Sequence, residues 1–556
     1  MTSPQLFDQY DIIIAGSGTA GGVILGRPAM ADPSLRISHI QPARYLTHLE
    51  PDSNTVKHAV GKPSDHPNGR QLAIQCGQCV GGGSRVGCMR PPASDNDDWA
   101  NVHDNPSWSF DDLLPLIKRA ETYHVATGKP SHGYDGPLKV SYGGARTNVG
   151  EDYIQTISQY DKTRAAVVDD ASSMTLMDLN HRRRSDVAHD HIHPALDGKS
   201  RNVHLLPGCA VRKVIVEDGK ATGVEYVLNS KVLPDADNTP RTARATKPVV
   251  LSAGAFGSPT ILERSGIGSK GILERNGIRQ TVVELPGVGE NYSDHPLIMI
   301  PFHAKEDADT LHGIVQGDPG EHEKWSAKWH EDGQGLMGSN GLDGTMHYRP
   351  SSEQEVGEIG AEFAERWASF YAGAPDKPVM LAAQLSGYIG AAPPPASHNV
   401  YSAGAHCSYP LGTGSVHITS AHDVDLPVDF DTGVLKRKED LAVMRHAWKL
   451  CREYGRRIAA AASPNHNTPV PTDAPDIVYT EEDDRAIDDL GTCAMRSRDK
   501  GGVVDSRLDV YGVQNLKVAD LSICPSIVAA NACSTAVLVG EKAAVIVAEE
   551  IGIAGV

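Results

Sequence analysis

Three glycines near the start of the chain have the spacing of a phosphate-binding turn. Gly16, Gly18 and Gly21 form the pattern G-x-G-x-x-G, and they follow an apolar run, residues 10–15, of the kind that forms a buried strand. The first glycine allows a tight bend, the second lets the backbone approach a pyrophosphate, and the third lets the following helix pack on the strand. The amides at the helix N-terminus can then bind phosphate oxygens. The motif predicts a Rossmann-like dinucleotide-binding domain.

Two features of the following segment depart from that pattern. The next strand of a dinucleotide site normally ends, about 20 residues further on, in an acidic residue that binds the adenosine ribose. Here the candidate strand, residues 35–40, is followed by Gln41, which we take as the residue at the ribose position. Pro28 falls within the predicted first helix, where a proline removes a hydrogen bond and shortens or kinks the helix. The phosphate cradle is complete, but its supporting parts are altered.

Four further motifs carry a resemblance to a known family. They are CVGGGSRVG at residues 79–87, VVLSAGAFGSPTILERSGIG at residues 249–268, PGVGENYSDHP at residues 286–296, and a C-terminal run that begins with LGTC at residue 490. Together with the first glycine motif, they resemble the glucose–methanol–choline (GMC) oxidoreductases, which are FAD flavoproteins, and within them the fungal alcohol (methanol) oxidases. The resemblance extends over nearly the whole chain.

The resemblance implies an α/β fold of two parts. The first is a Rossmann-like FAD-binding domain assembled from residues 1–150, 200–300 and 488–556, and the second is an α+β substrate domain, residues 151–199 and 301–487, built on an antiparallel sheet. A final apolar helix would direct its positive N-terminal end at a ring carbonyl of the cofactor. The implied cofactor contacts, besides the first glycines and Gln41, are Gly82, Gly83, Ser84, Val211, Asp520 and Thr535.

The catalytic residues of the family are only partly matched. The resemblance implies hydride transfer from an alcohol to the flavin, with a His that accepts the hydroxyl proton and a second His or an Asn that bonds the same oxygen. Such a base must reach the hydroxyl and have a pKa near the working pH. Asn531 matches the second position, but Asp488 and Asp489 precede Leu490, where the resemblance leads us to expect the His. The base of the family is therefore missing.

Three residues are the candidate catalytic groups: Asn531, Asp488 and Arg85. Asp488 could replace the base, with its pKa raised by burial, or it could be a solvated carboxylate in an acidic run. Asn531 could act in the site or only cap the final helix. Arg85 stands in a stretch that contacts the flavin in the family, where an arginine would add a fixed positive charge or displace the ring system.

These departures lead to three functional hypotheses. In the first, the chain is a GMC-fold enzyme that acts on a small organic molecule, such as a secondary metabolite, by non-oxidative cyclase, isomerase or lyase chemistry. In the second, it is an FAD-dependent alcohol oxidase or dehydrogenase with a relocated base, and in the third it is a non-catalytic binding protein. FAD binding stays open, because the glycines, Asp520 and the final helix favour it, whereas Gln41, Pro28 and Arg85 oppose it.

The composition restricts the partners. The 556 residues include 52 Lys and Arg against 70 Asp and Glu, so a positive face for nucleic acid or an anionic membrane is not expected. No stretch approaches the roughly 18 uninterrupted apolar residues of a membrane span, and the N-terminus does not resemble a secretory signal. Nine scattered cysteines suit a reducing cytosol. We expect a cytoplasmic protein that binds a small-molecule substrate and could form a homo-oligomer.

Two smaller patterns could indicate redox or metal chemistry. Cys76 and Cys79 form a C-x-x-C pair, but no second pair lies at zinc spacing, and buried thiols are the favoured interpretation. His189, His191 and His193 alternate, so an extended segment would place them on one face. A metal there would need a further ligand from elsewhere in the chain, so we favour hydrogen-bonded or solvated histidines and expect no metal.

Overall fold

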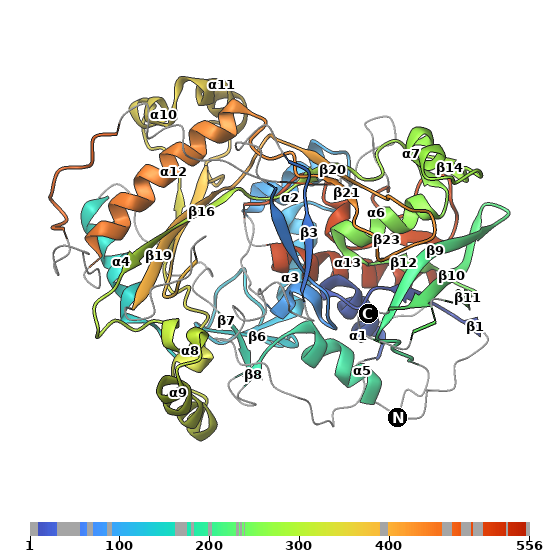
Figure 1. Cartoon of the computed structure of the whole chain (residues 1–556), viewed down its shortest axis with the longest axis horizontal. Coiled ribbons are helices and arrows are strands. Elements are labelled where there is room, and N and C mark those ends of the chain that lie inside the picture. Colours follow the sequence, from blue (N-terminus) through green and yellow to red (C-terminus); the bar gives the residue numbers. More distant parts are fainter. Residues whose placement is uncertain are drawn as a thin grey trace.

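Two regions of regular structure lie side by side, one around a parallel sheet and the other around an antiparallel sheet (Figure 1). The computed structural model describes residues 9–29, 56–63, 71–85, 92–161, 175–178, 183–197, 203–229, 233, 236–237, 239–389, 399–458, 470–479, 491–492, 504–529 and 532–551. Within these ranges, no helix combines the length and the apolar character that crossing a bilayer requires.

The parallel sheet joins three distant parts of the chain. Its strands are β2 (Ile13–Ala15), β12 (Val249–Leu251) and β23 (Leu516–Val518), in the order β2-β12-β23. The central strand is fully buried, as its unbroken apolar run predicts for a sheet that is covered on both faces. All three strands end at the same edge, where ligands of open parallel sheets bind.

Two helices next to this sheet pack closely against each other. They are α1 (Thr19–Ala29) and α13 (Ala532–Ile551). The close contact requires Gly540, because a Cβ there would lie only 2.8 Å from the carbonyl oxygen of Ala20. Pro28 lies within helix α1, which is described as far as Ala29, and the expected shortening or kinking of this helix stays a prediction.

The antiparallel sheet carries the second region. Its order is β16 (Leu297–His303), β19 (Val400–Cys407), β18 (Met380–Leu385) and β17 (Thr345–Tyr348). The long helix α12 (Lys438–Arg457) packs on this sheet, and Figure 1 shows it crossing the strands. Together, the two regions confirm the predicted fold class.

The remaining elements form smaller sheets and covering helices. The strands are β1 (Gln9–Tyr10), β11 (Arg241–Ala245), β10 (Lys220–Leu228) and β9 (Cys209–Glu217) in one sheet; β3 (Val56–Val60) and β4 (Ala73–Gly77); β5 (Glu121–Tyr123), β6 (Leu138–Ser141), β7 (Thr175–Asp178) and β8 (Arg183–Arg184); β13 (Ile267–Gly268) and β14 (Val283–Glu284); and β21 (Asp429–Asp431), β20 (Gly414–His417), β15 (Glu290–Ser293) and β22 (Gly491–Thr492). The helices are α2 (Ala93–Asn101), α3 (Phe110–Ala120), α4 (Asn148–Tyr160), α5 (His193–Asp197), α6 (Gly254–Arg264), α7 (Lys270–Arg275), α8 (His312–Gln316), α9 (Pro319–Asp332), α10 (Glu353–Ile359) and α11 (Ala364–Arg366).

Two expectations bear on these elements. The β5–β8 sheet joins residues from both sides of the expected domain boundary at residue 150, and the boundaries themselves stay a prediction.

The histidines of residues 189–193 are not extended: His189 and His191 lie in a π-helical turn, and His193 begins α5. The premise that they share one face of an extended segment was therefore wrong. His189 pairs with buried Asp186 (2.8 Å), and the described residues contain no cluster of three potential metal ligands.

Candidate active site

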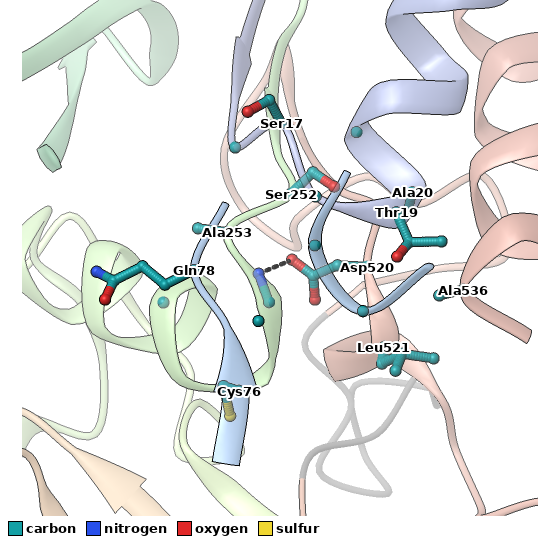
Figure 2. Close-up of a pocket in the computed structure, with 18 of the residues that line it drawn as sticks. Ser17, Thr19, Ala20, Cys76, Gln78, Ser252, Ala253, Asp520, Leu521 and Ala536 are labelled. Atoms are coloured by element: carbon teal, nitrogen blue, oxygen red, sulfur yellow. Dashed lines mark hydrogen bonds between the residues drawn. The ribbon is translucent and has the colours of Figure 1, made fainter. Parts of the chain in front are cut away.

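A cavity of about 1570 Å³ lies between the two regions. Turns at the ends of the three parallel strands line one part of it, and β16, β18 and β19 line another. Figure 2 shows Ser17 of the first turn, Ser252 after β12 and Asp520 after β23 gathered around the cavity. A single small-molecule site usually has about 300–1,000 Å³. The volume therefore suits a dinucleotide together with a second, smaller molecule.

The first glycine turn has the geometry of a phosphate cradle. Gly16 has φ +119°, and a Cβ there would lie 2.0 Å from the carbonyl oxygen of Ser252. A Cβ on Gly21 would lie 2.2 Å from the carbonyl oxygen of Gly16. Around Gly18, by contrast, no atom lies within 4 Å of the Cβ position. The two outer glycines close the turn, and the middle one leaves room for a ligand to approach the backbone.

A second glycine loop closes over the first. The Gly81 amide donates to the Ser17 carbonyl (2.8 Å), and the Thr19 hydroxyl donates to the Gly81 carbonyl (3.2 Å). A Cβ on Gly82 would lie 2.9 Å from the Cα of Gly18, so only glycine permits this approach. The Ser84 hydroxyl is fully buried and donates to the Gly81 carbonyl (2.7 Å), so it stabilises the loop.

Asp520 fixes the turn that follows β12. Its carboxylate accepts a hydrogen bond from the Gly254 amide at 3.0 Å, drawn in Figure 2, and another from the Ser258 hydroxyl. The Ser252 hydroxyl donates to the Ala519 carbonyl (2.8 Å), which ties the same two turns together. The carboxylate thus holds one edge of the cavity in place.

The start of helix α13 forms another part of the wall. Cys533 and Ala536 of its first turns line the cavity. The hydroxyl of Thr535 is buried and has no hydrogen-bond partner among the described residues. Thr535 does not line the cavity, so this hydroxyl does not test the fit of a ligand there. The open space at Gly18 and the amides of the first turn fit the pyrophosphate of a dinucleotide.

The structure brings most of the predicted cofactor residues together. Gly16, Gly18, Gly21, Gly82, Gly83, Val211 and Asp520 line the cavity, whereas Ser84 and Thr535 are not among its lining residues. Gln41, Asp488 and Asn531 lie outside the described residues, as does the side chain of Arg85, although its backbone ends the 3₁₀ turn Gly82–Arg85. Contact of each residue with a cofactor, and the catalytic role of Asn531, Asp488 and Arg85, stay predictions.

Two histidines in the cavity wall were not foreseen as site residues. The rings of His295 and His406 lie 4.3 Å apart, centroid to centroid, with 41° between their planes. Burial lowers the pKa of His295 to about 4 and that of His406 well below its usual value. Both rings are therefore neutral at neutral pH. His295 belongs to the motif PGVGENYSDHP, which could have singled it out, but no local pattern marks His406.

A buried acid and a thiol lie beside the pair. Burial raises the pKa of Asp294 to about 6, although it accepts a hydrogen bond from the His295 amide (2.9 Å). Burial, followed by the nearby Asp294 carboxylate, raises the pKa of Cys76 to about 12, so this thiol stays protonated. Neither Cys76 nor Cys79 forms a disulfide bond with another described residue. A protonated Cys76 is a poor nucleophile and metal ligand, which agrees with the interpretation as a buried thiol.

The loop that precedes α13 is held from three sides. Buried Asp95 accepts a hydrogen bond from the Ala529 amide (2.8 Å), His295 Nε2 donates to the Val528 carbonyl (2.9 Å), and the Trp99 indole donates to the Ser526 hydroxyl (3.1 Å). The three donors and acceptors come from α2 and from the segment before β16. The described part of this loop ends two residues before Asn531, so these contacts fix the backbone that precedes the predicted catalytic residue in the sequence.

Asp95 also ties this loop to the substrate region. Its carboxylate accepts hydrogen bonds from the Tyr409 hydroxyl (2.6 Å) and from the Lys377 ammonium group (3.2 Å), and Lys377 pairs in addition with Asp98 (2.8 Å). Burial raises the pKa of Asp95 to about 6, against the effect of Lys377. One carboxylate therefore connects α2, the antiparallel region and the C-terminal loop.

Comparison with family models decides the classification. The models for the N-terminal and C-terminal parts of the GMC oxidoreductases match residues 10–297 and 410–540. The chain belongs to the GMC oxidoreductase family. This confirms the resemblance drawn from the motifs, and it makes the chain a member of a family of FAD-dependent enzymes.

Individual relatives agree with this classification. The GMC oxidoreductase is 34% identical to the alcohol oxidase of Pichia angusta, over 99% of this chain and 96% of the relative, and 33% identical to that of Candida boidinii over the same shares. The fold of a formate oxidase matches with a TM-score of 0.80 at 20% identity, over 98% of both chains. An FAD-dependent oxidoreductase from Chaetomium thermophilum matches with a TM-score of 0.79 at 23% identity, over 98% of this chain and 100% of the other.

Proposed function

We propose that this GMC oxidoreductase binds FAD in the cavity and oxidises a small apolar alcohol there. The observation that carries the proposal is the continuity of the cavity. It runs from the glycine turns to the antiparallel sheet, where the residues of β16, β18 and β19 that line it are apolar except for His406. A cofactor site and a substrate site therefore share one enclosure, as transfer between the two molecules requires.

Particular residues would hold the cofactor. The backbone of residues 16–21 and of the second glycine loop would receive the pyrophosphate, Val211 would lie toward the adenine, and Asp520 with the start of α13 would lie toward the ring system. When it is bound, FAD supplies a ring that accepts a hydride. The protein orients the alcohol, excludes water and holds the hydroxyl proton. The two alcohol oxidases named above support this choice of substrate class.

A second candidate is non-oxidative conversion of a small organic molecule in the same cavity. The observation that favours it is in the sequence: Asp488 and Asp489 stand where the family has its catalytic His, and Arg85 enters the flavin-contacting stretch. Cyclase, isomerase or lyase chemistry could then rely on positioning and charge alone. A substrate from secondary metabolism, a cytoplasmic location and self-association are further proposals that rest on the sequence.

The visible spectrum of the purified protein tests both candidates. We expect a flavin absorption band that benzyl alcohol or 1-hexanol bleaches under anaerobic conditions, with formation of the aldehyde. A flavin band that stays unchanged while a substrate is converted would favour non-oxidative chemistry. A colourless protein that cannot be reconstituted with FAD would refute the proposal, and a protein that binds ligands without converting any would favour the non-catalytic hypothesis.

A further inference from the structure

His406 occupies an unusual place on the antiparallel sheet. In a sheet, directly paired residues point to the same face, and so do residues two apart along one strand. His406 pairs with Leu297 on one side and Leu381 on the other, and the next row of the same face is Met299, Gly404 and Ala383. All six residues line the cavity. His406 is therefore the one polar side chain among the cavity-lining residues of these three strands.

The contacts of the ring leave one nitrogen for a ligand. His406 Nδ1 lies 3.3 Å from the Cys407 carbonyl oxygen, which can only accept, so the ring proton of the neutral form belongs on Nδ1. The lone pair then lies on Nε2. Because burial lowers the pKa of His406, this neutral form prevails at neutral pH. Among the residues of these three strands that line the cavity, His406 is thus a single acceptor beside apolar side chains, which suits a ligand that has an apolar body and one hydroxyl group.

A chain of contacts connects His406 to the predicted catalytic end of the cavity. The His295 ring packs 4.3 Å from the His406 ring, and its Nε2 donates to the Val528 carbonyl (2.9 Å). Val528 lies three residues before Asn531 and four before the first residue of α13. His406 thus lies on the side of the cavity where the resemblance places the reacting end of the cofactor.

The mouth of the cavity points to the same class of ligand. Leu297, which pairs with His406, is 55% exposed, and Ile389, which also lines the cavity, is 39% exposed. Large apolar side chains at an opening favour the entry of apolar molecules, because a polar ligand would lose hydration there without compensation.

We propose that His406 is the residue that binds the hydroxyl group of an apolar primary alcohol and accepts its proton. This rests on the proposed function for the oxidant, which is oxidised flavin. The O–H bond of the alcohol breaks, and its proton goes to Nε2 of His406. One C–H bond on the carbon that bears the hydroxyl group breaks, and its hydrogen leaves with both electrons as a hydride that oxidised flavin accepts. The C=O bond of an aldehyde forms. His295 acts as a positioning residue that packs on the His406 ring. On this proposal, His406 takes the role of the histidine that the resemblance leads us to expect before Leu490.

A pair of ligands that differ in one hydroxyl group tests the binding part without turnover. Benzyl alcohol and toluene are titrated under anaerobic conditions into the flavin-loaded protein after its flavin has been reduced with dithionite, so that no hydride can be transferred, and their Kd values are measured by calorimetry. One hydrogen bond in a water-poor site corresponds to about a tenfold preference for the alcohol. We expect His406→Phe to remove this preference and His322→Gln, on helix α9 and outside the cavity wall, to keep it. Equal binding of both ligands to the wild type, or a preference that survives His406→Phe, would overturn the proposal.

Turnover tests the proton transfer separately. A positioned base contributes about 10²–10⁴-fold to the rate, so we expect at least a 100-fold fall in kcat for His406→Phe, with flavin content and thermal unfolding unchanged. His406→Gln keeps an acceptor and should retain part of the preference for benzyl alcohol while losing turnover; it also covers the case that His406→Phe does not fold. If the wild type prefers benzyl alcohol but no alcohol bleaches the flavin, the proposed oxidation fails while the hydroxyl site stands.

Discussion

The two ends of the cavity are built by different means. At the glycine end, backbone groups bond one another, and the positions of Gly16, Gly21 and Gly82 are set by contacts that leave no space for a side chain. At the sheet end, the wall consists of aliphatic side chains and His406 on three antiparallel strands. The first end recognises a ligand through amides and shape, and the second through the side chains that the strands present.

This difference determines what each end tolerates. The backbone cradle fails when Gly16, Gly21 or Gly82 gains a side chain, because the clash is with main-chain atoms that cannot move independently. A wall of side chains changes its specificity when one of them is replaced, because strands keep their register while the surface changes. The glycine end should therefore be fixed for one cofactor, while the sheet end decides the substrate.

The largest expected effect is at the glycine end. Gly21→Val places a Cβ 2.2 Å from the Gly16 carbonyl oxygen, so the turn must open. We expect FAD affinity to fall about 1,000-fold, or by about 4 kcal/mol, so that the purified variant carries no flavin band. Absorbance of the purified protein and titration with FAD measure this.

The control for this substitution is another helical glycine. A Cβ on Gly271 in α7 meets no atom within 4 Å, so Gly271→Ala should keep the wild-type flavin content. A yellow Gly21→Val variant with wild-type FAD affinity would show that the turn does not hold the cofactor, and the contrast between the two ends would be lost.

The same contrast explains how much could be predicted from the sequence. The glycine turn, the strand after residue 249 and the final helix are local patterns in which residue type and conformation are coupled, so both the α/β fold and the cofactor end followed from the motifs. His406 and Asp95 belong to no such pattern. Their roles depend on strand register and on contacts between segments more than 300 residues apart, as between Asp95 and Tyr409, and a single sequence does not contain that information.

The next largest expected effect is a loss of stability when Asp95, which connects the loop before α13 to the antiparallel region, is replaced. Asp95→Ala removes the carboxylate that bonds Ala529, Tyr409 and Lys377. Among the described carboxylates, it leaves the buried Lys377 ammonium group paired with Asp98 alone. Breaking a buried ion pair costs about 3–5 kcal/mol. We expect a loss of about 3 kcal/mol in the free energy of unfolding, measured by urea denaturation, because Asp98 retains part of the pairing.

Asp98→Ala is the matched control for this loss. Its side chain is 29% exposed, and a partly solvated pair contributes about 1 kcal/mol or less. If Asp95→Ala and Asp98→Ala lower the free energy of unfolding equally, the contacts of Asp95 contribute no more to stability than a partly exposed ion pair does.

The smallest expected effect is a pH-dependent change in the free energy of unfolding that comes from the glycine end of the cavity. His417 on β20 bonds Glu263 of α6 (2.6 Å), the helix that follows the Ser252 turn, and Glu290 (3.2 Å). Burial alone would lower the pKa of His417, but these hydrogen bonds raise it to about 9. The folded state then holds a proton that the unfolded state releases near pH 6.5, so this stabilisation is complete below pH 6.5 and is lost as the pH rises through 9.

His417→Gln should remove this part of the pH dependence. A hydrogen bond to a charged group contributes about 1.5–3 kcal/mol, so we expect the variant to lose about 2 kcal/mol at pH 6 and little at pH 10, measured by urea unfolding at both values. His322→Gln, on the exposed helix α9, should keep the wild-type change between the two pH values. An equal loss of stability at pH 6 and pH 10 would mean that His417 stabilises α6 through packing, because only the charged form depends on pH in this window.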